Sequence, residues 1–444
     1  MSTEHTPDVV VIGGGIAGLS AAALIGRRGR RVRLFEKAGF VGGRAVTQVK
    51  NGFSFNVGPH ALYRDAAGIR VLAELGVTPR GAVPRTGGGH AMLGGVGHAF
   101  PGGPRELLMT RLLTFRGKLE VARLLGRLSA LDPGPWQART VGEWLASVAH
   151  AGEVRLLLGA LVRLATYVNA PDLMSGGAAL EQVQRALAKS VLYLDGGWQQ
   201  LVDALRAAAI TAGVTIETGV RVDAVEEPVD GGTRVVRLAD GTCLRCTSAI
   251  LAVAPEDAAR LGAGAARALL ERCSRDAIGV RAACLDLALD ALPAPRTTFG
   301  LGIDTPLYFS VHSAVADLTP GRGALVHVAK YLDPLAPEDA ARDLAELEAF
   351  TDLLQPGWRA HVVHRRFLPR MTVSHALVTA RGGGLAGRPG PEIEPGLYVA
   401  GDWVGAEGLL ADGSFASARR AAELCLARIA GATVRTAPGL SHSA

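Results

Sequence analysis

The chain has 444 residues, of which 48% are hydrophobic and 5% aromatic, and its formal net charge is +6. Its basic residues form no runs interleaved with aromatic side chains, which excludes base stacking and hence a nucleic acid partner. An uncharged stretch over residues 9–26 contains five glycines, which argues against a membrane span. A chain of this length is expected to fold as two or three domains.

A dinucleotide-binding turn is indicated near the N-terminus. Residues 9–12, VVVI, are typical of a buried strand, and Gly13, Gly15 and Gly18 follow in G-x-G-x-x-G spacing before a helix over 16–25. The first glycine allows the tight turn, the second lets a pyrophosphate approach the backbone, and the third lets helix and strand pack closely. The phosphates then lie at the positive end of the helix.

An acidic residue follows at the distance that such a turn requires. The next strand, VRLFE, ends at Glu36, about 20 residues after the glycines, where a carboxylate accepts hydrogen bonds from ribose hydroxyl groups. The same carboxylate repels a 2′-phosphate, which disfavours NADP. The segment GAGAARA at Gly262 lacks a preceding strand, so no separate NAD(P)H site is expected.

The remaining elements change in type along the chain. We expect a short strand within residues 52–63, mostly helix from 65 to 189 with a glycine-rich hairpin in it, and a helix over 198–210. Residues 214–255 alternate apolar and polar side chains around DGG and DGT turns, which indicates a meander. A strand within 396–405 and a helix over 414–430 close the pattern.

This order predicts a discontinuous domain. If the last strand and helix join the first ones, a Rossmann-type domain is assembled from residues 1–65, 190–255 and 392–444. Residues 66–189, mostly helical, and 256–391, mixed helix and strand, then form a substrate or cap domain. The predicted fold class is α/β, a discontinuous nucleotide-binding domain with an inserted mixed α+β substrate domain.

The glycine turn continues into a longer pattern. After Glu36 the chain reads KAGFVGGRA, which contains Gly42, Gly43 and Arg44. The whole pattern resembles flavin-containing amine oxidases, protoporphyrinogen oxidases and bacterial phytoene desaturases, in which these glycines and this arginine contact the pyrophosphate of FAD. Arginine offers a forked donor to phosphate oxygens, and glycines permit close approach. The resemblance implies FAD as the cofactor.

Two later segments resemble the same superfamily. The strand GVRVDAVE is similar to its adenine-side strand, which implies that the backbone of Val222 holds the adenine. The segment GLYVAGDWVG is similar to its flavin-binding end, which implies that Gly401 and Asp402 approach the ribityl and pyrophosphate groups. Backbone donors at the start of the last helix would face flavin N1 and O2, where a helix N-terminus stabilises the negative charge of reduced flavin.

The residues expected to bind the cofactor are therefore spread over the whole chain. They are Gly13, Gly15, Ile16, Ala17, Gly18, Glu36, Lys37, Gly42, Gly43, Arg44, Gly58, Pro59, Val222, Gly401, Asp402, Leu410, Ala411, Asp412 and Gly413.

Departures from the amine oxidase pattern narrow the substrate class. Those enzymes line the substrate face with two tyrosines, one near the start of the last helix, where this chain has Leu410. The lysine that many of them hold near flavin N5 would fall within IGVRAACLDL, which contains none. An aromatic cage for amines is therefore not evident. No cysteine occurs between Cys284 and Cys425, so we expect noncovalent FAD.

The closer likeness is to phytoene desaturases and carotenoid isomerases, through GGRA followed by GFSFNVGPH. In that branch a strand of this kind ends at a Gly-Pro near the flavin ring, which corresponds to Gly58-Pro59 here. His60, the next residue, is the candidate catalytic acid or base, and the alternative is a histidine that only hydrogen-bonds in the pocket wall.

Four further residues are candidates for substrate contact. Tyr308 and His312 alternate on a predicted strand and are expected to share one face, which would lie over the flavin. Trp403 and Glu407 lie in the predicted flavin loop, where contact with substrate or cofactor and plain loop packing are the two alternatives.

No metal site is expected. Cys243 and Cys246 form a C-x-x-C pair, but no second pair completes a zinc site, so the five cysteines are interpreted as structural thiols. His361 and His364 lack carboxylate partners at metal-ligand spacing.

The segment 105–128 has leucines at helical spacing with six basic residues against two acidic ones. This pattern is typical of a helix in a membrane interface, or of a cap helix with a solvated basic face. The start of the chain, MSTEHTPD, resembles neither a signal nor a transit peptide. We therefore expect a cytoplasmic protein, with peripheral membrane attachment as one alternative.

The expected function is oxidation of an apolar substrate, of the isoprenoid or polyene kind, by hydride transfer to flavin N5. Oxygen, a quinone or another carrier is expected to accept the electrons. Three alternatives stay open: an amine or amino-acid oxidase, a flavin-dependent isomerase or saturase, and an FAD-binding protein without turnover. The shape of the cavity before the flavin distinguishes them, because a long apolar tunnel towards residues 105–128 favours a lipid-like chain and a short polar cage with an acid favours an amine.

Overall fold

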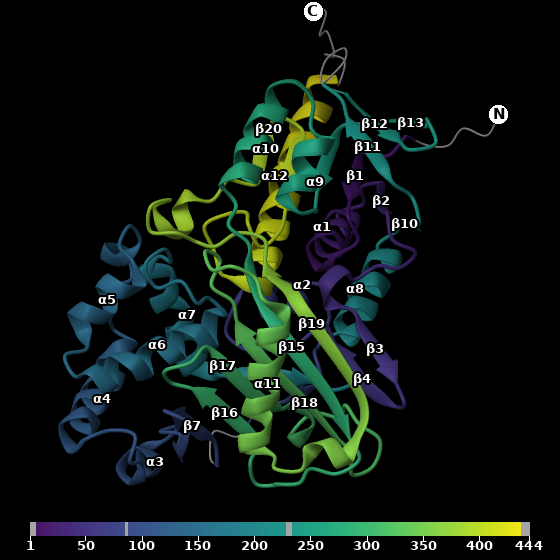
Figure 1. Ribbon diagram of the computed structural model, residues 1–444. Helices are drawn as coiled ribbons and strands as arrows, with labels where there is room; N and C mark the ends of the chain where they lie inside the picture. The colour runs from purple at the N-terminus through teal and green to yellow at the C-terminus, as the bar shows by residue number, and fades with distance from the viewer. Residues whose placement is uncertain (1–5, 85–87, 228–232, 437–444) are drawn as a thin grey trace, which may run out of the picture.

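The computed structural model describes residues 6–84, 88–227 and 233–436, with side chains as far as residue 431. Two sheets organise the molecule (Figure 1). One lies near the two chain ends, and the other lies at the opposite end beside a group of helices. Among the described helices, none has both the length and the apolar character that are needed to cross a bilayer.

The first sheet has six strands and is built from three distant parts of the chain. Its order is β10 (Thr215–Thr218), β2 (Val32–Glu36), β1 (Val9–Ile12), β14 (Ser248–Leu251), β21 (Leu397–Val399) and β20 (Glu392–Glu394). All neighbours pair in parallel except β20 and β21. A parallel sheet with a glycine turn after its central strand is the Rossmann arrangement that the sequence predicts.

Both faces of this sheet are covered. One face packs against α1 (Ile16–Gly26), α2 (Ala67–Glu74), α8 (Gln199–Thr211) and α12 (Leu410–Thr436). The other face packs against the meander β11 (Val222–Val225), β12 (Arg234–Leu238) and β13 (Cys243–Cys246), together with α9 (Pro255–Leu261) and α10 (Gly264–Asp276). Burial on both faces explains the continuous apolar run in β1.

The domain boundary expected at residue 255 differs from the structure. Leu261 and Leu270, in α9 and α10, share a buried cluster with Val225 and Val236 of the meander, so the chain leaves this domain only after residue 276. The sequence pattern changes from strand to helix at Pro255, and that change coincides with a new element but not with a new core. A second difference concerns β9 (Val191–Leu194), which pairs with β5 (Leu62–Tyr63) and β6 (Gly81–Ala82) in a separate small sheet.

The second sheet has seven strands and supports the substrate side of the molecule. Its order is β19 (Val362–Ser374), β15 (Val280–Leu289), β18 (Ala324–Tyr331), β17 (Leu307–Val311), β16 (Phe299–Gly302), β7 (His90–Leu93) and β8 (Val96–Ala99). The helix α11 (Ala340–Leu354) covers one face, and the hairpin β3 (Thr47–Lys50) and β4 (Phe53–Asn56) packs two phenylalanines against the other. The expected glycine-rich hairpin forms β7 and β8, while its residues 85–87 lie outside the described residues.

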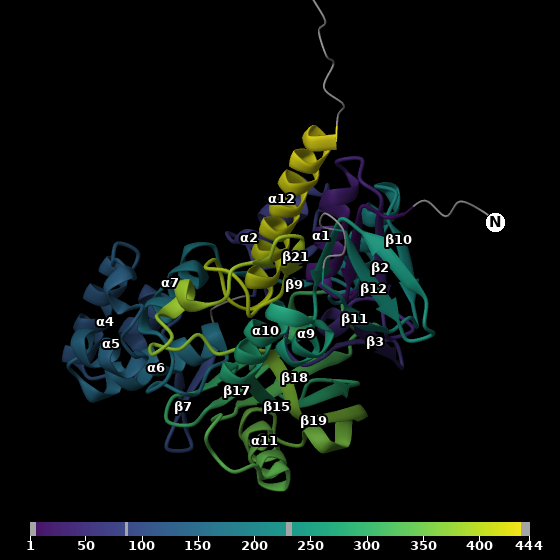
Figure 2. The same cartoon turned by 90° about the horizontal axis from the view of Figure 1, so that it is seen from above.

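The helical unit lies beside this sheet (Figures 1 and 2). It comprises α3 (Pro104–Met109), α4 (Phe115–Leu128), α5 (Val141–Val148), α6 (Gly152–Thr166) and α7 (Gly176–Lys189). Its helices surround one buried cluster that includes Trp144, Leu157 and Leu180. Short 3-10 turns occur at Gly43–Ala45, Gly134–Trp136, His312–Ala314, Trp358–His361 and Gly384–Gly387.

Candidate active site

The three glycines of the turn after β1 have different structural roles. Gly13 has a φ of +105°, and a Cβ added there would lie 2.4 Å from the carbonyl oxygen of Ala252. A Cβ at Gly18 would lie 1.9 Å from the carbonyl oxygen of Gly13. Gly15 is the opposite case, because no protein heavy atom lies within 4 Å of an added Cβ. Two of the glycines therefore let the backbone pack on itself, and Gly15 keeps space open in front of the turn.

The helix α1 begins at this turn with unused backbone donors. Its N-cap, Gly15, makes no side-chain cap, and its first turn contains no acidic residue. The first N–H groups of a helix have no partner within the helix, so they are available to an anion. Gly15, Ile16 and Ala17 line the cavity at this point.

Glu36 lies at the edge of the same cavity. Its two carboxylate oxygens accept hydrogen bonds from the backbone N–H of Gly14 (2.7 Å) and of Ala38 (2.8 Å). Both bonds fix the carboxylate, and each oxygen keeps a further lone pair for a hydroxyl group. Glu36 also lines a second hollow of 510 Å³ that Val222 and Phe35 border, on the side where the sequence places the adenine.

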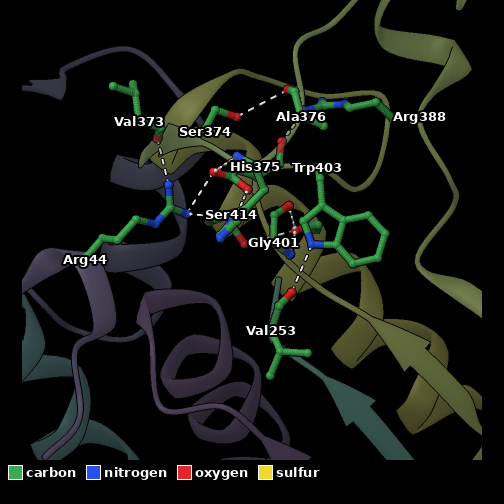
Figure 3. A network of polar contacts seen from close by, with 12 residues as sticks. Arg44, Val253, Val373, Ser374, His375, Ala376, Arg388, Gly401, Trp403 and Ser414 are labelled. Atoms are coloured by element: carbon green, nitrogen blue, oxygen red, sulfur yellow. Dashed lines mark hydrogen bonds and ion pairs between the residues drawn. The ribbon is translucent and has the colours of Figure 1, made fainter. Parts of the chain in front are cut away.

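An ion network centred on the buried Asp402 joins segments that are far apart in the chain (Figure 3). The Arg44 guanidinium donates to Asp402 Oδ2 (2.8 Å) and to the carbonyl oxygen of Val373 (2.7 Å). His375 donates to the same carboxylate from its Nδ1 (2.9 Å) and from its backbone N–H (3.2 Å). Burial by itself would raise the pKa of Asp402, but Arg44 and His375 outweigh it and hold this pKa below its ordinary value. Asp402 is therefore ionised at neutral pH.

Arg388 fixes the loop that follows Asp402. It donates to the carbonyl oxygens of Asp402 (2.8 Å), Gly408 (2.8 Å) and Glu407 (3.2 Å). Burial lowers the pKa of Arg388 to about 10, so the side chain stays charged at neutral pH. The sequence predicts a role for neither Arg388 nor His375, because each lies in an irregular segment without a motif.

At the start of α12, two of the four predicted cofactor residues line the cavity and two do not. Leu410, which has a φ of +55°, and Ala411 line the cavity. Asp412 is buried away from it, and its carboxylate accepts a hydrogen bond from the backbone N–H of Gly68 (2.8 Å). Burial raises the pKa of Asp412 to about 6. Gly413 also lies off the cavity wall, where an added Cβ would meet Arg388 at 3.2 Å.

Most of the predicted cofactor residues border the two hollows. In the larger hollow these are Gly13, Gly15, Ile16, Ala17, Glu36, Lys37, Gly42, Gly43, Arg44, Pro59, Gly401, Asp402, Leu410 and Ala411, and Val222 borders the smaller one. Gly18 and Gly58 lie off both walls, where Gly18 packs against the backbone of Gly13 and a Cβ at Gly58 would meet the side chain of Met371 at 2.4 Å from its Sδ.

The larger hollow is one cavity of 1160 Å³ that runs from the glycine turn into the helical unit. Its acidic lining residues are Glu36, Asp257 and Asp402, all at the nucleotide end. Within the described part of the helical unit, the lining carries no charged side chain. It includes Leu107, Val121, Leu124, Leu125, Leu128, Leu157, Leu158, Leu161, Leu164, Val183 and Leu187, and Phe100 lines the cavity just before this unit begins.

His60 lines the larger cavity beside Pro59. Its Nδ1–H donates to the carbonyl oxygen of Gly58 (3.1 Å), and its ring meets Trp198 edge-on at 5.1 Å between centroids. Burial lowers the pKa of His60 to about 4. The imidazole is therefore neutral at pH 7, and its Nε2 carries a free lone pair.

Tyr308 and His312 do not share one face of a strand. Tyr308 lines the cavity together with Tyr193, and the two hydroxyl oxygens lie 3.2 Å apart. The strand β17 ends at Val311, so His312 begins a 3-10 turn and lies behind the wall, stacked on Tyr193 at 3.8 Å. The Tyr308 hydroxyl reaches His312 Nε2 at 3.4 Å. His312 therefore supports the wall from behind.

Trp403 and Glu407 are not among the residues that line the cavity. Trp403 is buried against the Rossmann sheet, and its Nε1–H donates to the carbonyl oxygen of Val253 (3.0 Å; Figure 3). Glu407 forms an ion pair with Arg70 on the far side of the loop. Both positions agree with loop packing, the alternative to substrate contact.

The cysteines also lie off both walls, and all five are free thiols. The described residues contain no group of three or more His, Cys, Asp or Glu side chains that could hold a metal ion. His361 instead pairs with Asp290 at 2.8 Å.

A Rossmann domain joined through one long cavity to a second domain is the arrangement that the sequence predicts for a flavoprotein oxidoreductase. The family model for flavin-containing amine oxidoreductases matches residues 16–426, and the chain belongs to this family. Its cofactor is FAD. The open space at Gly15, the uncapped start of α1, and the arginine and carboxylate groups on the wall fit a bound dinucleotide.

Named relatives differ in the substrate that their names state. The chain is 30% identical over 240 residues to a Mycobacterium tuberculosis protein named "Putative flavin-containing monoamine oxidase AofH", which covers 49% of this chain and 51% of that protein. The chain thus spans about half the length of this curated relative. It is also 39% identical over 77 residues to a phytoene desaturase of Cercospora nicotianae, covering 17% of this chain and 12% of that one.

The fold has close counterparts among solved structures. An oxidoreductase from Methanosarcina mazei superimposes with a TM-score of 0.74 at 19% identity and covers 94% of this chain and 99% of its own. At this identity the likeness shows the fold alone.

Proposed function

We propose that this protein uses FAD to oxidise a long apolar molecule by removing hydrogen atoms from two adjacent carbons, as desaturases of the isoprenoid or polyene class do. The observation that carries the proposal is the lining of the 1160 Å³ cavity, which has no charged side chain within the described part of the helical unit. Burial of a charged ammonium group in such a lining would be costly. Burial of a hydrocarbon chain there is favourable, at about 25 cal/mol for each Å² of apolar surface.

The chemistry that FAD supplies when bound is two-electron oxidation, with a hydride accepted at flavin N5. The substrate loses this hydride from one carbon and a proton from the neighbouring carbon, and a C=C bond forms between them. The two electrons leave through oxygen, a quinone or another carrier. The chain must therefore hold the two reacting carbons, take up one proton and exclude water.

His60 is the candidate proton acceptor. It lies on the cavity wall next to Pro59, and the bond to the Gly58 carbonyl oxygen holds its Nδ1–H, so the lone pair is on Nε2. A pKa of about 4 keeps this lone pair free at neutral pH. Tyr193 and Tyr308 form the adjacent wall, and their hydroxyl groups are engaged with each other. The part of the wall that the helical unit supplies carries no charged side chain within the described residues, which favours exclusion of water from the reacting bond.

The second candidate function is oxidation of an apolar amine. The likeness to the monoamine oxidase AofH favours it. The cavity disfavours it, because Leu410 lies on the wall where the amine oxidases place a tyrosine.

The test is an anaerobic half-reaction with the FAD-loaded enzyme. A solubilised isoprenoid polyene, its shortened analogue, amines and a porphyrinogen are mixed separately with oxidised enzyme, and bleaching of the flavin absorbance is followed. We expect bleaching by the long polyene. Bleaching by amines alone would assign the protein to the amine oxidases. A polyene that only changes geometry, after dithionite has reduced the enzyme, would assign it to the isomerases.

A matched pair of variants on α6 tests the tunnel itself. Leu161→Trp fills the cavity, whereas Leu156→Trp is the control, since Leu156 is exposed on the same helix and does not line the cavity. The proposal predicts that Leu161→Trp slows reduction by the long polyene and spares the shortened analogue, while Leu156→Trp changes neither. Equal rates for both variants with the long substrate would contradict it.

A further inference from the structure

Three large apolar side chains are strongly exposed at one corner of the helical unit. The corner, defined as residues 105–128, contains α3, α4 and their connection. Leu108 is 73% exposed, Met109 is 65% exposed and Phe115 is 80% exposed. Such a group of neighbouring exposed apolar side chains marks an interaction surface, because soluble surfaces rarely cluster them.

The same corner is basic. It carries Arg105, Arg111, Arg116, Lys118, Arg123 and Arg127 against only Glu106 and Glu120. The Glu120 carboxylate accepts hydrogen bonds from the backbone N–H groups of His150 (2.6 Å) and Ala151 (3.2 Å). All five arginines are exposed to solvent, and none of them forms an ion pair with another described residue.

The corner is also where the cavity reaches the surface. Ala122 and Leu125 on α4, and Leu187 on α7, are exposed and line the cavity as well. The cavity therefore opens at this corner, and it also opens at the nucleotide end, where Lys37 and Gly43 are exposed on its wall. Figures 1 and 2 show α4 at the outer edge of the helical unit, away from the Rossmann sheet.

We propose that this corner docks onto the surface of a bilayer that contains anionic lipid, and that the cavity opens there to take its substrate from the membrane. Leu108, Met109 and Phe115 enter the headgroup region, and the surrounding arginines and Lys118 contact lipid phosphates. A second copy of this chain fits less well, because two such corners would bring their positive charges together. The docking is inferred only from the exposed residues of this corner, whereas the route of the substrate into the cavity rests on the proposed function.

The first experiment measures flotation of the FAD-loaded, full-length protein with vesicles. Vesicles of phosphatidylcholine with phosphatidylglycerol are compared with phosphatidylcholine alone. We expect binding to the anionic vesicles that falls with added salt, since exposed charges are screened over about 10 Å at 0.1 M ionic strength. Equal binding to both kinds of vesicle at low and high salt would overturn the electrostatic part, and no binding at all would overturn the proposal.

Matched variants locate the surface. A triple variant with Leu108→Ser, Met109→Ser and Phe115→Ser is compared with Leu335→Ser/Leu353→Ser, which removes two exposed leucines near α11. We expect the triple variant to lose binding by about tenfold or more for each inserted side chain, and the control to bind as the parent does. Equal loss in both variants would overturn the assignment to this corner. A parent that is a dimer in size-exclusion chromatography, and a triple variant that is a monomer, would show a contact between copies instead.

The last experiment separates docking from function. Polyene is offered either in detergent or in anionic vesicles, and anaerobic flavin bleaching is followed. We expect the triple variant to react like the parent in detergent, with unchanged FAD content, and more slowly from vesicles. A parent that floats with vesicles but is bleached by no polyene would refute the proposed function and leave the docking intact. Equal rates from vesicles for parent and variant would overturn the membrane route.

Discussion

Substitution of Gly15 by alanine should separate stability from cofactor binding. The backbone at Gly15, with φ −71° and ψ 178°, suits alanine, and no protein heavy atom lies within 4 Å of the added methyl group. Because alanine restricts the unfolded chain more than glycine does, the free energy of unfolding of the apoprotein should rise by about 0.4–1 kcal/mol. The methyl group instead points into the space that the pyrophosphate of FAD needs. A penalty of about 1–3 kcal/mol for such overpacking corresponds to FAD affinity about 5- to 150-fold weaker.

The measurement combines FAD titration of the apoprotein with thermal unfolding in the presence and absence of FAD. Gly18→Ala is the matched control, because its Cβ would lie 1.9 Å from the carbonyl oxygen of Gly13. That variant should lose stability with or without the cofactor, whereas Gly15→Ala should lose only the stabilisation that FAD adds. A Gly15→Ala protein that binds FAD as tightly as the parent would refute the assignment of this space to the pyrophosphate.

Three further outcomes are expected. Asp402 has a pKa held below its ordinary value, so the stability that its charged form contributes is present above about pH 4 and is lost as the pH falls. Release of FAD on acidification should follow this pH profile in the parent protein. The variant Asp402→Asn should bind FAD weakly already at neutral pH. His60→Gln should slow anaerobic flavin reduction by about 100-fold or more at unchanged FAD content. The reduction rate of the parent protein should not change with pH above about pH 5, because the pKa of His60 is about 4. A variant that is reduced as fast as the parent would show that His60 takes no part in the reaction. Denatured protein should release all its flavin into the filtrate, since none of the cysteines borders the cavity, and colour retained on the precipitated chain would contradict noncovalent binding.

Local features of the sequence predicted the nucleotide end of the site well. The turn at Gly13, the strand that ends at Glu36 and the helix between them depend on residues close together in the chain, and the structure contains all three. Resemblance to a family then supplied Arg44 and Asp402. Their mutual ion pair joins positions 358 residues apart, which no local pattern encodes.

Residues held only by tertiary contacts were missed or misplaced. Arg388 and His375 act through carbonyl and carboxylate groups on other segments, so neither shows in a local motif. His312 was expected on the face of Tyr308 because the sequence alternates there, but the strand ends one residue earlier and the chain turns. The predicted domain boundary at residue 255 differs from the structure for a related reason. The sequence pattern changes from strand to helix there, but α9 and α10 still pack against the meander of the first domain.

The position of β1 in the first sheet has a consequence for biosynthesis. β1 pairs with β2 on one side and with β14 on the other. β14 pairs in turn with β21, which is synthesised much later and ends at Val399. At ribosomal speeds of about 5–20 residues per second, the interval from Glu36 to Val399 lasts about 20–70 s. Throughout it, the apolar strand that opens the chain lacks part of its sheet, and Asp402 has not yet joined Arg44. The cofactor site is therefore complete only once the segment that contains Asp402 has been synthesised and has joined Arg44.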